Sequence, residues 1–519
     1  MIRIAHTENG ALRGIEAADP RITAFKGIPF AAPPVGKNRW RAPQPAASWE
    51  GVREACRFAP ISMQSVPGLG TDIYCREWHV DPEIPMSEDC LYLNVWTGAK
   101  NPEERRPVLV WFFGGALQWG YPAEMEFDGE RLARRGIVVV SVNYRLNVFG
   151  FLAHPQLTRE QPQAPCNFGS LDQQAGLRWV ARNIAAFGGD PGNVTIAGQS
   201  AGGGSVLSQM ACKDNAGLFQ KAVIMSAMIR SPYQEGGVGV PEELADAEKN
   251  GEAFFAGLGV GTLEEARELD AALIRDRYYE YIRSHPAMFT VLDGHFCVGD
   301  PLAMYAAGEC VDVAVMAGNT EDEFLSGISA SDEEELEQEA RRIFGDSADR
   351  FLACPEAHER TDAGYAPVNG IGCTVKSEFL ANAAGSRPRA NYCYSFRSDI
   401  PGWDNPGTFH SVDLWFFFET LAKCWRPFTG RHYDLARQMC NYWANFIATG
   451  NPNGKDTDGK DMPVWDAYTP EHRTEMIFTG DGPVAETNEE TDFIRMLTDQ
   501  IGGMLKKDSG AAGRDGKSD

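Results

Sequence analysis

The sequence lacks the surplus of basic side chains that binding to nucleic acid requires. It carries 48 Lys and Arg residues against 72 Asp and Glu residues, a formal net charge of −24 at pH 7. Phosphate recognition and docking on anionic lipid both depend on positive charge. The sequence therefore argues against a nucleic-acid partner and a membrane partner, and favours a soluble protein that acts on neutral or weakly charged small molecules.

Long apolar runs and clustered cysteines are also missing. No run approaches the roughly 20 residues that a helix needs to cross a bilayer, and residues 1–8 lack the basic and then apolar pattern of a secretory signal. The 12 cysteines are scattered, without a C-x-x-C pair or a His-Cys cluster. We therefore expect no metal site, no redox dithiol and a cytoplasmic protein with reduced thiols.

Short apolar runs alternate with helical stretches along the chain of 519 residues, which is long enough for one large domain or a few average ones. Residues 107–113 form a continuous apolar run, as expected for a strand buried on both faces, and residues 173–186 have apolar side chains at helical spacing. Five further runs read as strands: 137–142, 194–197, 222–225, 311–316 and 391–396. This alternation predicts an α/β fold with a mostly parallel sheet covered on both sides.

Three segments depart from this rhythm. Residues from about 240 to 290 and from about 330 to 385 are helical and polar, and we expect them to be insertions above a sheet edge that line a substrate pocket. The acidic run 332–335 is expected to begin a helix, because negative charge suits a helix N-terminus. Residues 506–519 are small and polar, which predicts a disordered tail.

The strongest local signal is a G-x-S-x-G motif formed by Gly198, Ser200 and Gly202. It directly follows the predicted strand 194–197 and directly precedes a helix-capable run, which is the setting of a nucleophile elbow. The turn is so tight that Gly198 and Gly202 must be glycine, because a Cβ atom at either position would crowd the strand or the helix. Ser200 would then lie at a helix N-terminus, where free N–H groups favour developing negative charge.

A serine needs a base to remove its proton and an acid to hold that base. His410 follows the last predicted strand, and Glu323 follows the predicted strand 311–316. Both lie where loops leave the carboxyl end of a strand, the edge at which α/β proteins place their active sites. Asp322 competes with Glu323 as the acid, and the spacing does not choose between them.

An oxyanion hole is the third requirement. Gly115 and Ala116 follow the predicted strand 107–113, and their small side chains allow a substrate to approach their N–H groups closely. With the N–H of Ala201, they would give three donors. Removing one such donor typically lowers the rate by roughly 10²- to 10³-fold.

Further motifs flank these segments in a fixed order. They lie at residues 25–36, 87–94, 167–173, 183–191 and 449–453, the last followed by Trp465. Together with the elbow, they resemble the motifs of the type-B carboxylesterase/cholinesterase family of α/β-hydrolases from about residue 3 to about residue 470. The resemblance implies one large α/β-hydrolase domain over residues 1–505, with the two helical insertions above its active site.

The resemblance also implies the roles of the site residues. The family's nucleophile position is Ser200, its base is His410, and the acid of its G-x-x-x-D-E motif lands on Glu323 and not on Asp322. Its oxyanion donors fall on Gly115, Ala116 and Ala201. These positions imply a serine carboxylesterase that needs no cofactor and acts on small-molecule esters.

The chain also departs from the family pattern. Ala116 replaces the third glycine that is common in the oxyanion loop. In secreted relatives the position of Cys90 forms a disulfide with a cysteine about 27 residues earlier, and no cysteine stands there, so we expect Cys90 to be reduced, with Cys75 as an alternative partner. Gln199 stands where cholinesterases have Glu, and we therefore expect no choline ester as substrate.

Some alternatives stay open on the sequence. A feruloyl or other aryl ester would fit the same mechanism, and a non-catalytic binding protein could be built on the same fold. The aromatic residues near the predicted site could line a gorge or pack in the core: Trp111, Phe112, Phe113, Trp119 and the run 415–418. The sequence predicts neither the acyl group nor the oligomeric state.

Overall fold

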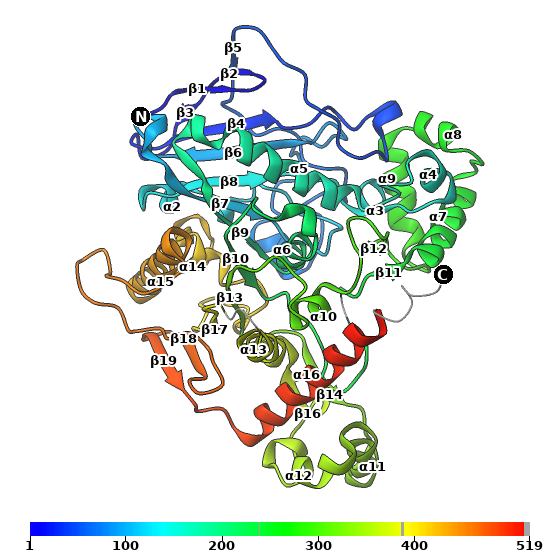
Figure 1. Ribbon diagram of the computed structural model, residues 1–519, viewed down its shortest axis with the longest axis vertical. Helices are drawn as coiled ribbons and strands as arrows, with labels where there is room; N and C mark the ends of the chain where they lie inside the picture. The colour runs from blue at the N-terminus through cyan, green and yellow to red at the C-terminus, as the bar shows by residue number, and fades with distance from the viewer. Residues whose placement is uncertain (238, 386–388, 513–519) are drawn as a thin grey trace.

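A large mixed sheet forms the centre of the computed structural model, which describes residues 1–237, 239–385 and 389–512 (Figure 1). Within these residues the sheet has 11 strands, in the order β19 (Gly482–Thr487), β18 (Thr474–Thr479), β17 (Tyr392–Arg397), β13 (Ala314–Thr320), β10 (Lys221–Met225), β9 (Gly189–Gln199), β7 (Arg106–Phe112), β8 (Val138–Val142), β6 (Tyr92–Thr97), β4 (Thr23–Pro29) and β3 (Ile15–Glu16). The strands from β18 to β8 run parallel, and antiparallel strands extend both edges. The α/β-hydrolase fold class is confirmed.

Alternate side chains of the central strands enter two separate cores. In β7, Val108 and Val110 lie in one core, and Leu109 and Trp111 lie in the other. Successive side chains of a strand point to opposite faces, so a strand covered on both sides must be apolar throughout. This is why the run 107–113 could be recognised as a buried strand.

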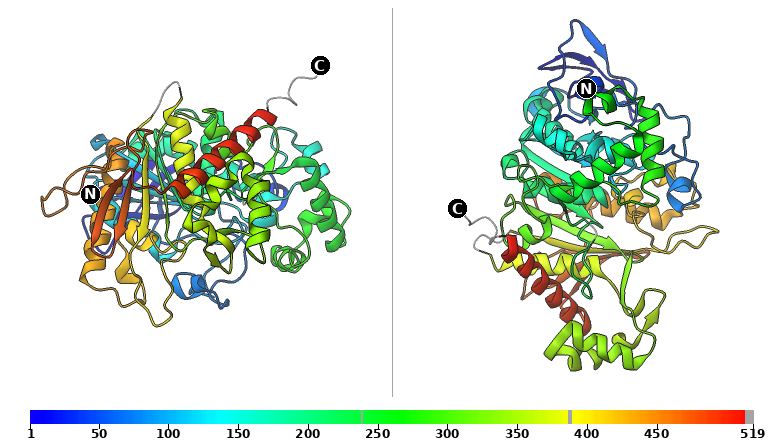
Figure 2. Two further views of the ribbon diagram at one scale, coloured as in Figure 1. Left: turned by 90° about the horizontal axis from the view of Figure 1, so that it is seen from below. Right: turned by 90° about the vertical axis from the view of Figure 1, so that its right-hand side faces the viewer.

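Helices cover both faces of this sheet (Figures 1 and 2). The helices that contribute to one core include α5 (Phe168–Asn183), α6 (Ala201–Ala211), α10 (Pro301–Ala306), α13 (Gly370–Ala383) and α16 (Asp492–Ala512). The helices of the other core are α2 (Glu130–Arg134), α14 (Leu414–Phe417) and α15 (Gly430–Thr449). No helix in the described ranges is both long enough and apolar enough to traverse a lipid bilayer.

One predicted strand begins three residues later than the sequence suggests. The expected strand 311–316 is β13 at Ala314–Thr320, and the N–H of Val311 instead donates to the carbonyl of Met210 at the end of α6. Residues 311–313 are therefore part of the loop before β13, and this loop packs on the end of α6. The shift carries β13 to Thr320, three residues before Glu323.

The first insertion packs beside the sheet as a separate helical layer. It contains α7 (Leu244–Leu258), α8 (Leu263–Glu268) and α9 (Ala271–Tyr281), which share a core with α3 (Asn147–Phe151) and α4 (Pro155–Glu160). Figure 1 shows these helices together at one side of the molecule. Tyr278 of α9 donates to Gln118 Oε1 at 2.8 Å, so the insertion contacts the loop that carries Gly115 and Ala116.

The second segment, about 330–385, is only partly an insertion. Its first half forms α11 (Glu333–Phe344) and α12 (Ala348–Leu352), which project at one end of the molecule in Figure 1. Asp332 caps α11 by accepting the N–H of Glu335 at 3.0 Å, which confirms the predicted helix start. The prediction is wrong for α13, which packs directly on β13 and β17 of the sheet, although buried residues of α11 and α12 join the same core.

The predicted disordered tail is wrong for residues 506–512. These residues continue α16, which reaches Ala512, while residues 513–519 lie outside the described residues. Met496, Leu497, Ile501 and Leu505 are buried at helical spacing against the core. The last turns of α16 are small and polar, so their composition did not suggest a helix. The apolar face of the earlier turns packs on the core and stabilises the whole helix.

Candidate active site

Ser200 occupies a sharp turn between a strand and a helix. It is the single residue between β9, which ends at Gln199, and α6, which begins at Ala201. Its φ of 56° and ψ of −129° are unfavourable for a residue with a Cβ atom. Its N–H donates to the carbonyl of Met225 at the end of β10 at 2.8 Å. The predicted elbow geometry is present, and it presents a half-buried serine at the carboxyl edge of the sheet.

The two glycines of the motif are required because strand and helix nearly touch. A Cβ atom at Gly198 would lie 2.3 Å from the carbonyl carbon of Gly202. A Cβ atom at Gly202 would lie 2.1 Å from the carbonyl oxygen of Phe112 in β7. Both clashes are with backbone, so no side-chain rotation can relieve them.

We expect Gly202→Ala to destabilise the protein by more than about 4 kcal/mol, because the added methyl must push β7 away from α6. Gly204, two residues later in the same helix, is the matched control, since an added Cβ there meets nothing within 4 Å. Gly204→Ala is expected to be neutral or to stabilise by about 0.5–1 kcal/mol. Urea unfolding of the two variants measures both effects, and equal losses would contradict the steric explanation.

His410 and Glu323 come from neighbouring loops and meet directly. His410 lies between β17 and α14, and Glu323 follows β13. Nδ1 of His410 is 2.5 Å from Oε2 of Glu323. The other carboxylate oxygen, Oε1, accepts the N–H of Thr320 at 3.1 Å and its hydroxyl at 2.9 Å. The structure thus fixes one ring nitrogen of His410 on a fully hydrogen-bonded carboxylate.

Asp322, the competing acid, points elsewhere. Its Oδ2 accepts the N–H of Thr408 at 2.6 Å, and Asp322 and Phe409 form an isolated β-bridge. This contact joins the loop after β13 to the loop that carries His410. The geometry brings Glu323, and not Asp322, to the imidazole.

Glu323 is ionised despite its burial. Burial alone would raise the pKa of this carboxyl, but its interactions with His410 and with the hydroxyl of Thr320 hold the pKa below its ordinary value of 4.5. An ionised carboxylate only accepts hydrogen bonds, so Nδ1 of His410 must carry a proton.

The second ring nitrogen of His410 faces the elbow. Its Nε2 lies 3.3 Å from Nε2 of Gln199, the residue that precedes Ser200. In the described part of the chain, the hydrogen bonds of His410 go to Glu323 and Gln199, and none joins it to Ser200. The structure therefore brings His410 and Glu323 into contact and places the imidazole beside the elbow.

The loop after β7 lies against Ser200. A Cβ atom at Gly114 would lie 3.2 Å from the Cβ atom of Ser200, and Gly115 and Ala116 have φ angles of 107° and 53°. Within the described residues, no hydrogen bond uses the N–H of Gly115 or Ala116. The N–H of Ala201, the first residue of α6, has no partner within the helix. Within the described residues, these three N–H groups therefore have no hydrogen-bond acceptor.

Asp413 lies buried behind this pair and was not among the predicted site residues. Its Oδ2 accepts the hydroxyl of Tyr394 at 3.0 Å, and its Oδ1 has no hydrogen-bond partner in the described structure. Burial and the charge of Glu323 raise the pKa of Asp413 from 3.8 to about 7. It lies three residues after His410 in the sequence, and this spacing is the signal from which the sequence could have suggested it.

The raised pKa of Asp413 predicts a stability that falls with pH. Below about pH 4 the group is protonated in both the folded and the unfolded chain, and between pH 4 and pH 7 only the unfolded chain loses its proton. Stability is therefore lost as the pH rises to about 7. Asp413→Asn should remove this loss and gain on the order of a few kcal/mol relative to the wild type between pH 4 and pH 8. Urea unfolding across this range measures it, and a constant difference would contradict it.

Most of the aromatic residues belong to the core and do not line a gorge. Trp111, Phe112 and Phe113 are at most 1% exposed, and the run 415–418 is fully buried. Trp119 is 38% exposed. Phe324, which the sequence did not single out, is 61% exposed, and its ring centroid lies 4.8 Å from that of His410. Of the two alternatives, the core therefore holds for all of these predicted residues except Trp119.

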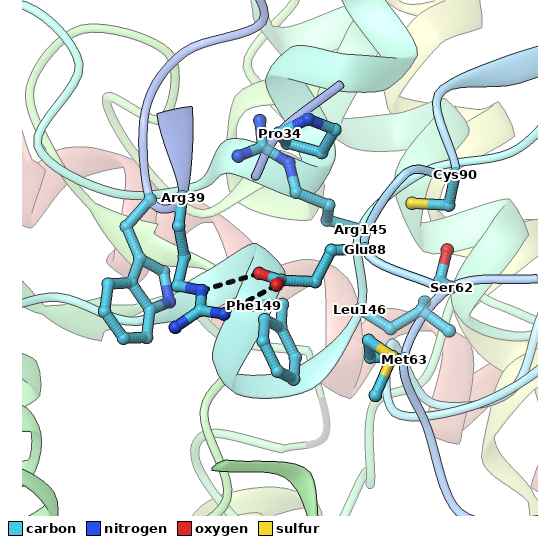
Figure 3. Close-up of a pocket in the computed structure, with 10 residues that line it drawn as sticks. Pro34, Arg39, Ser62, Met63, Glu88, Cys90, Arg145, Leu146 and Phe149 are labelled. Atoms are coloured by element: carbon cyan, nitrogen blue, oxygen red, sulfur yellow. Dashed lines mark hydrogen bonds and ion pairs between the residues drawn. The ribbon is translucent and has the colours of Figure 1, made fainter. Parts of the chain in front are cut away.

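Cys90 is reduced and buried, as expected. All 12 cysteines are free in the described residues, including Cys75. Cys90 lines a cavity of about 10 Å³ beside the ion pair of Arg39 and Glu88 (Figure 3), whose Nε–Oε1 distance is 2.7 Å. This volume holds about one water molecule, so the cavity is too small for an ester.

A parallel sheet with a strained serine at its carboxyl edge, beside an imidazole held by a carboxylate, defines a serine hydrolase of the α/β-hydrolase class. The model of the carboxylesterase family matches residues 2–363 and 371–494. The chain belongs to the carboxylesterase family and is a carboxylic ester hydrolase.

Several known proteins are similar to this chain. Fumonisin B1 esterase of Sphingopyxis macrogoltabida is 31% identical over 87% of this chain and 82% of its own length. Acetylcholinesterase of Bungarus fasciatus is also 31% identical, over 89% of this chain and 80% of its own. The structure of a Geobacillus stearothermophilus carboxylesterase matches with a TM-score of 0.71 at 27% identity, covering 96% of this chain and 100% of that one. A PNB esterase structure matches with a TM-score of 0.75 at 27% identity, covering 96% and 99%.

Proposed function

We propose that this carboxylesterase hydrolyses small-molecule esters with Ser200 as nucleophile, His410 as base and Glu323 as the acid that holds the base. The observation that carries the proposal is the 2.5 Å contact of His410 with Glu323, beside a serine in a strained turn. Backbone strain persists only where the surrounding structure enforces it, and it gathers at functional sites. A binding protein without catalysis would have no use for it.

The proposed reaction begins with attack of Ser200 Oγ on the ester carbonyl carbon. The hydroxyl proton passes to Nε2 of His410, while Glu323 keeps the other ring proton on Nδ1 and stabilises the imidazolium. The C–O bond of the ester then breaks, and the alcohol leaves with the proton from Nε2. Water repeats these steps on the acyl-enzyme and releases the acid.

The oxyanion that forms in both halves is proposed to bind the N–H groups of Gly115, Ala116 and Ala201. The free state of these donors supports the assignment, because they need no rearrangement to receive a ligand.

Labelling with a fluorophosphonate tests the nucleophile. Such a probe phosphonylates an activated serine, and we expect one adduct per chain on the peptide that contains Ser200, found by mass spectrometry. Ser200→Ala should remain unlabelled. Ser208, a hydroxyl later in α6 whose Oγ donates to the carbonyl of Gly204, gives the matched control Ser208→Ala, which should label fully. An adduct on another residue would refute the assignment.

The kind of ester that the enzyme hydrolyses remains a prediction. The acids near the site and the exposed Phe324 and Trp119 are consistent with a neutral substrate that has an apolar part. Absence of nucleic-acid binding and a cytoplasmic location likewise stay predictions from the sequence.

A further inference from the structure

The side chain of Gln199 contacts the one atom of His410 that must receive the serine proton. Gln199 ends β9, is 2% exposed, and places its Nε2 3.3 Å from Nε2 of His410. Its Oε1 faces the loop at Gly114, where an added Cβ would lie 3.3 Å from it. A buried amide that spans from the oxyanion loop to the base is not explained by the proposed triad.

Two nitrogens form a hydrogen bond only when one of them has a free lone pair. Nδ1 of His410 carries a proton, because it bonds the ionised carboxylate of Glu323. In the neutral imidazole Nε2 then has a lone pair, which can accept an N–H of the Gln199 amide. The contact is therefore specific for the neutral ring, since an imidazolium would set two donors against each other.

We propose that Gln199 is a positioning residue that holds His410 neutral in the resting enzyme, with its proton on Nδ1 and its Nε2 lone pair accepting the amide N–H of Gln199, the residue before Ser200. The proposal rests on the proposed function of Ser200 and His410. When Oγ of Ser200 bonds to the carbonyl carbon, its proton moves to Nε2, and the amide contact is lost. The new Nε2–H then has no acceptor in Gln199 and is left to the departing alcohol.

The proposal predicts where activity is lost at low pH. The amide N–H stabilises the neutral ring, so it extends activity to lower pH than a residue without a donor would allow. The titratable groups around His410 are Glu323 after β13, Asp413 on its own segment, Tyr394 of β17 and Tyr74 of α1 (Ile73–Glu77). Asp413 titrates near neutral pH, so the experiment is run in parallel in an Asp413→Asn background.

The test is the pH dependence of kcat/KM for p-nitrophenyl acetate in Gln199→Met and Gln199→Glu. Loss of one hydrogen bond to the neutral ring should move the acidic midpoint of Gln199→Met upward by about 0.5–1 pH unit. A carboxylate at this position favours the charged ring, and Gln199→Glu should move the midpoint upward by about 1–3 pH units. A downward shift in Gln199→Met would show that the amide oxygen faces the ring and would overturn the proposal, as would unchanged midpoints in both variants.

Two controls separate this inference from simpler effects. Gln209 of α6 is another buried glutamine, which donates to the carbonyl of Ser170 at 2.9 Å, and Gln209→Met should leave the midpoint unchanged. Midpoints that move equally in Gln209→Met would overturn the proposal. If Ser200→Ala retains full activity, the proposed function fails. If Ser200→Ala is inactive and the Gln199 midpoints do not move, only the role of Gln199 fails.

Discussion

Ser200→Ala is expected to lower kcat for p-nitrophenyl acetate by about 10⁴- to 10⁶-fold. Alanine removes the only oxygen that can form the acyl-enzyme, while the methyl group fits the same strained turn. The residual rate should come from the oxyanion donors and from binding alone. Steady-state hydrolysis of the acetate and butyrate esters by wild type and variant, side by side, measures the loss.

The fold of the Ser200→Ala protein should be intact, because the conformation of the turn is fixed by backbone contacts. The N–H at position 200 still donates to the carbonyl of Met225, and Gly198 and Gly202 still allow strand and helix to approach. Urea unfolding should therefore differ by less than about 1 kcal/mol from the wild type. Equal turnover by both proteins would show that Ser200 is not the nucleophile.

Features set by local backbone geometry could be predicted from the sequence. The elbow follows from two glycines around a serine, because a Cβ at either glycine would meet backbone within 2.3 Å. The buried strands follow from unbroken apolar runs, because both faces of the sheet are covered. The pairing of His410 with Glu323, and not with Asp322, needed the family resemblance, since adjacent residues cannot be separated by spacing.

Features set by tertiary packing could not be predicted. The contact of Gln199 with His410 joins residues 211 positions apart, and no pattern marks it. The raised pKa of Asp413 depends on burial beside Glu323, which residue order does not show. The aromatic run 415–418 reads equally as gorge or core until the sheet beneath it is known. The tail was misread because α16 is held by contacts with α13 and α10, which lie far back in the chain.

Glu323→Gln is expected to lower kcat by about 10⁴-fold, although the two side chains have the same shape. The reason is the pair of donors at Thr320, whose N–H and hydroxyl both point at Oε1 of residue 323. The amide oxygen of the glutamine must accept these donors, so its NH₂ group must face Nδ1 of His410. Nδ1 then becomes an acceptor, and the ring proton moves to Nε2.

An imidazole with its proton on Nε2 cannot take the proton of Ser200, so the variant would hold its base in the wrong tautomer. Asp322→Asn is the matched control, because its oxygen can still accept the N–H of Thr408 and does not touch the ring. It should keep kcat within a few-fold of the wild type. If the two variants lose activity equally, the acid acts by its charge near the loop and not by its bond to Nδ1. Adding Thr320→Val to Glu323→Gln removes the hydroxyl donor, which frees the amide to turn its oxygen toward His410. Partial recovery of kcat in that double variant would identify the tautomer, and not the lost charge, as the main cause of the loss.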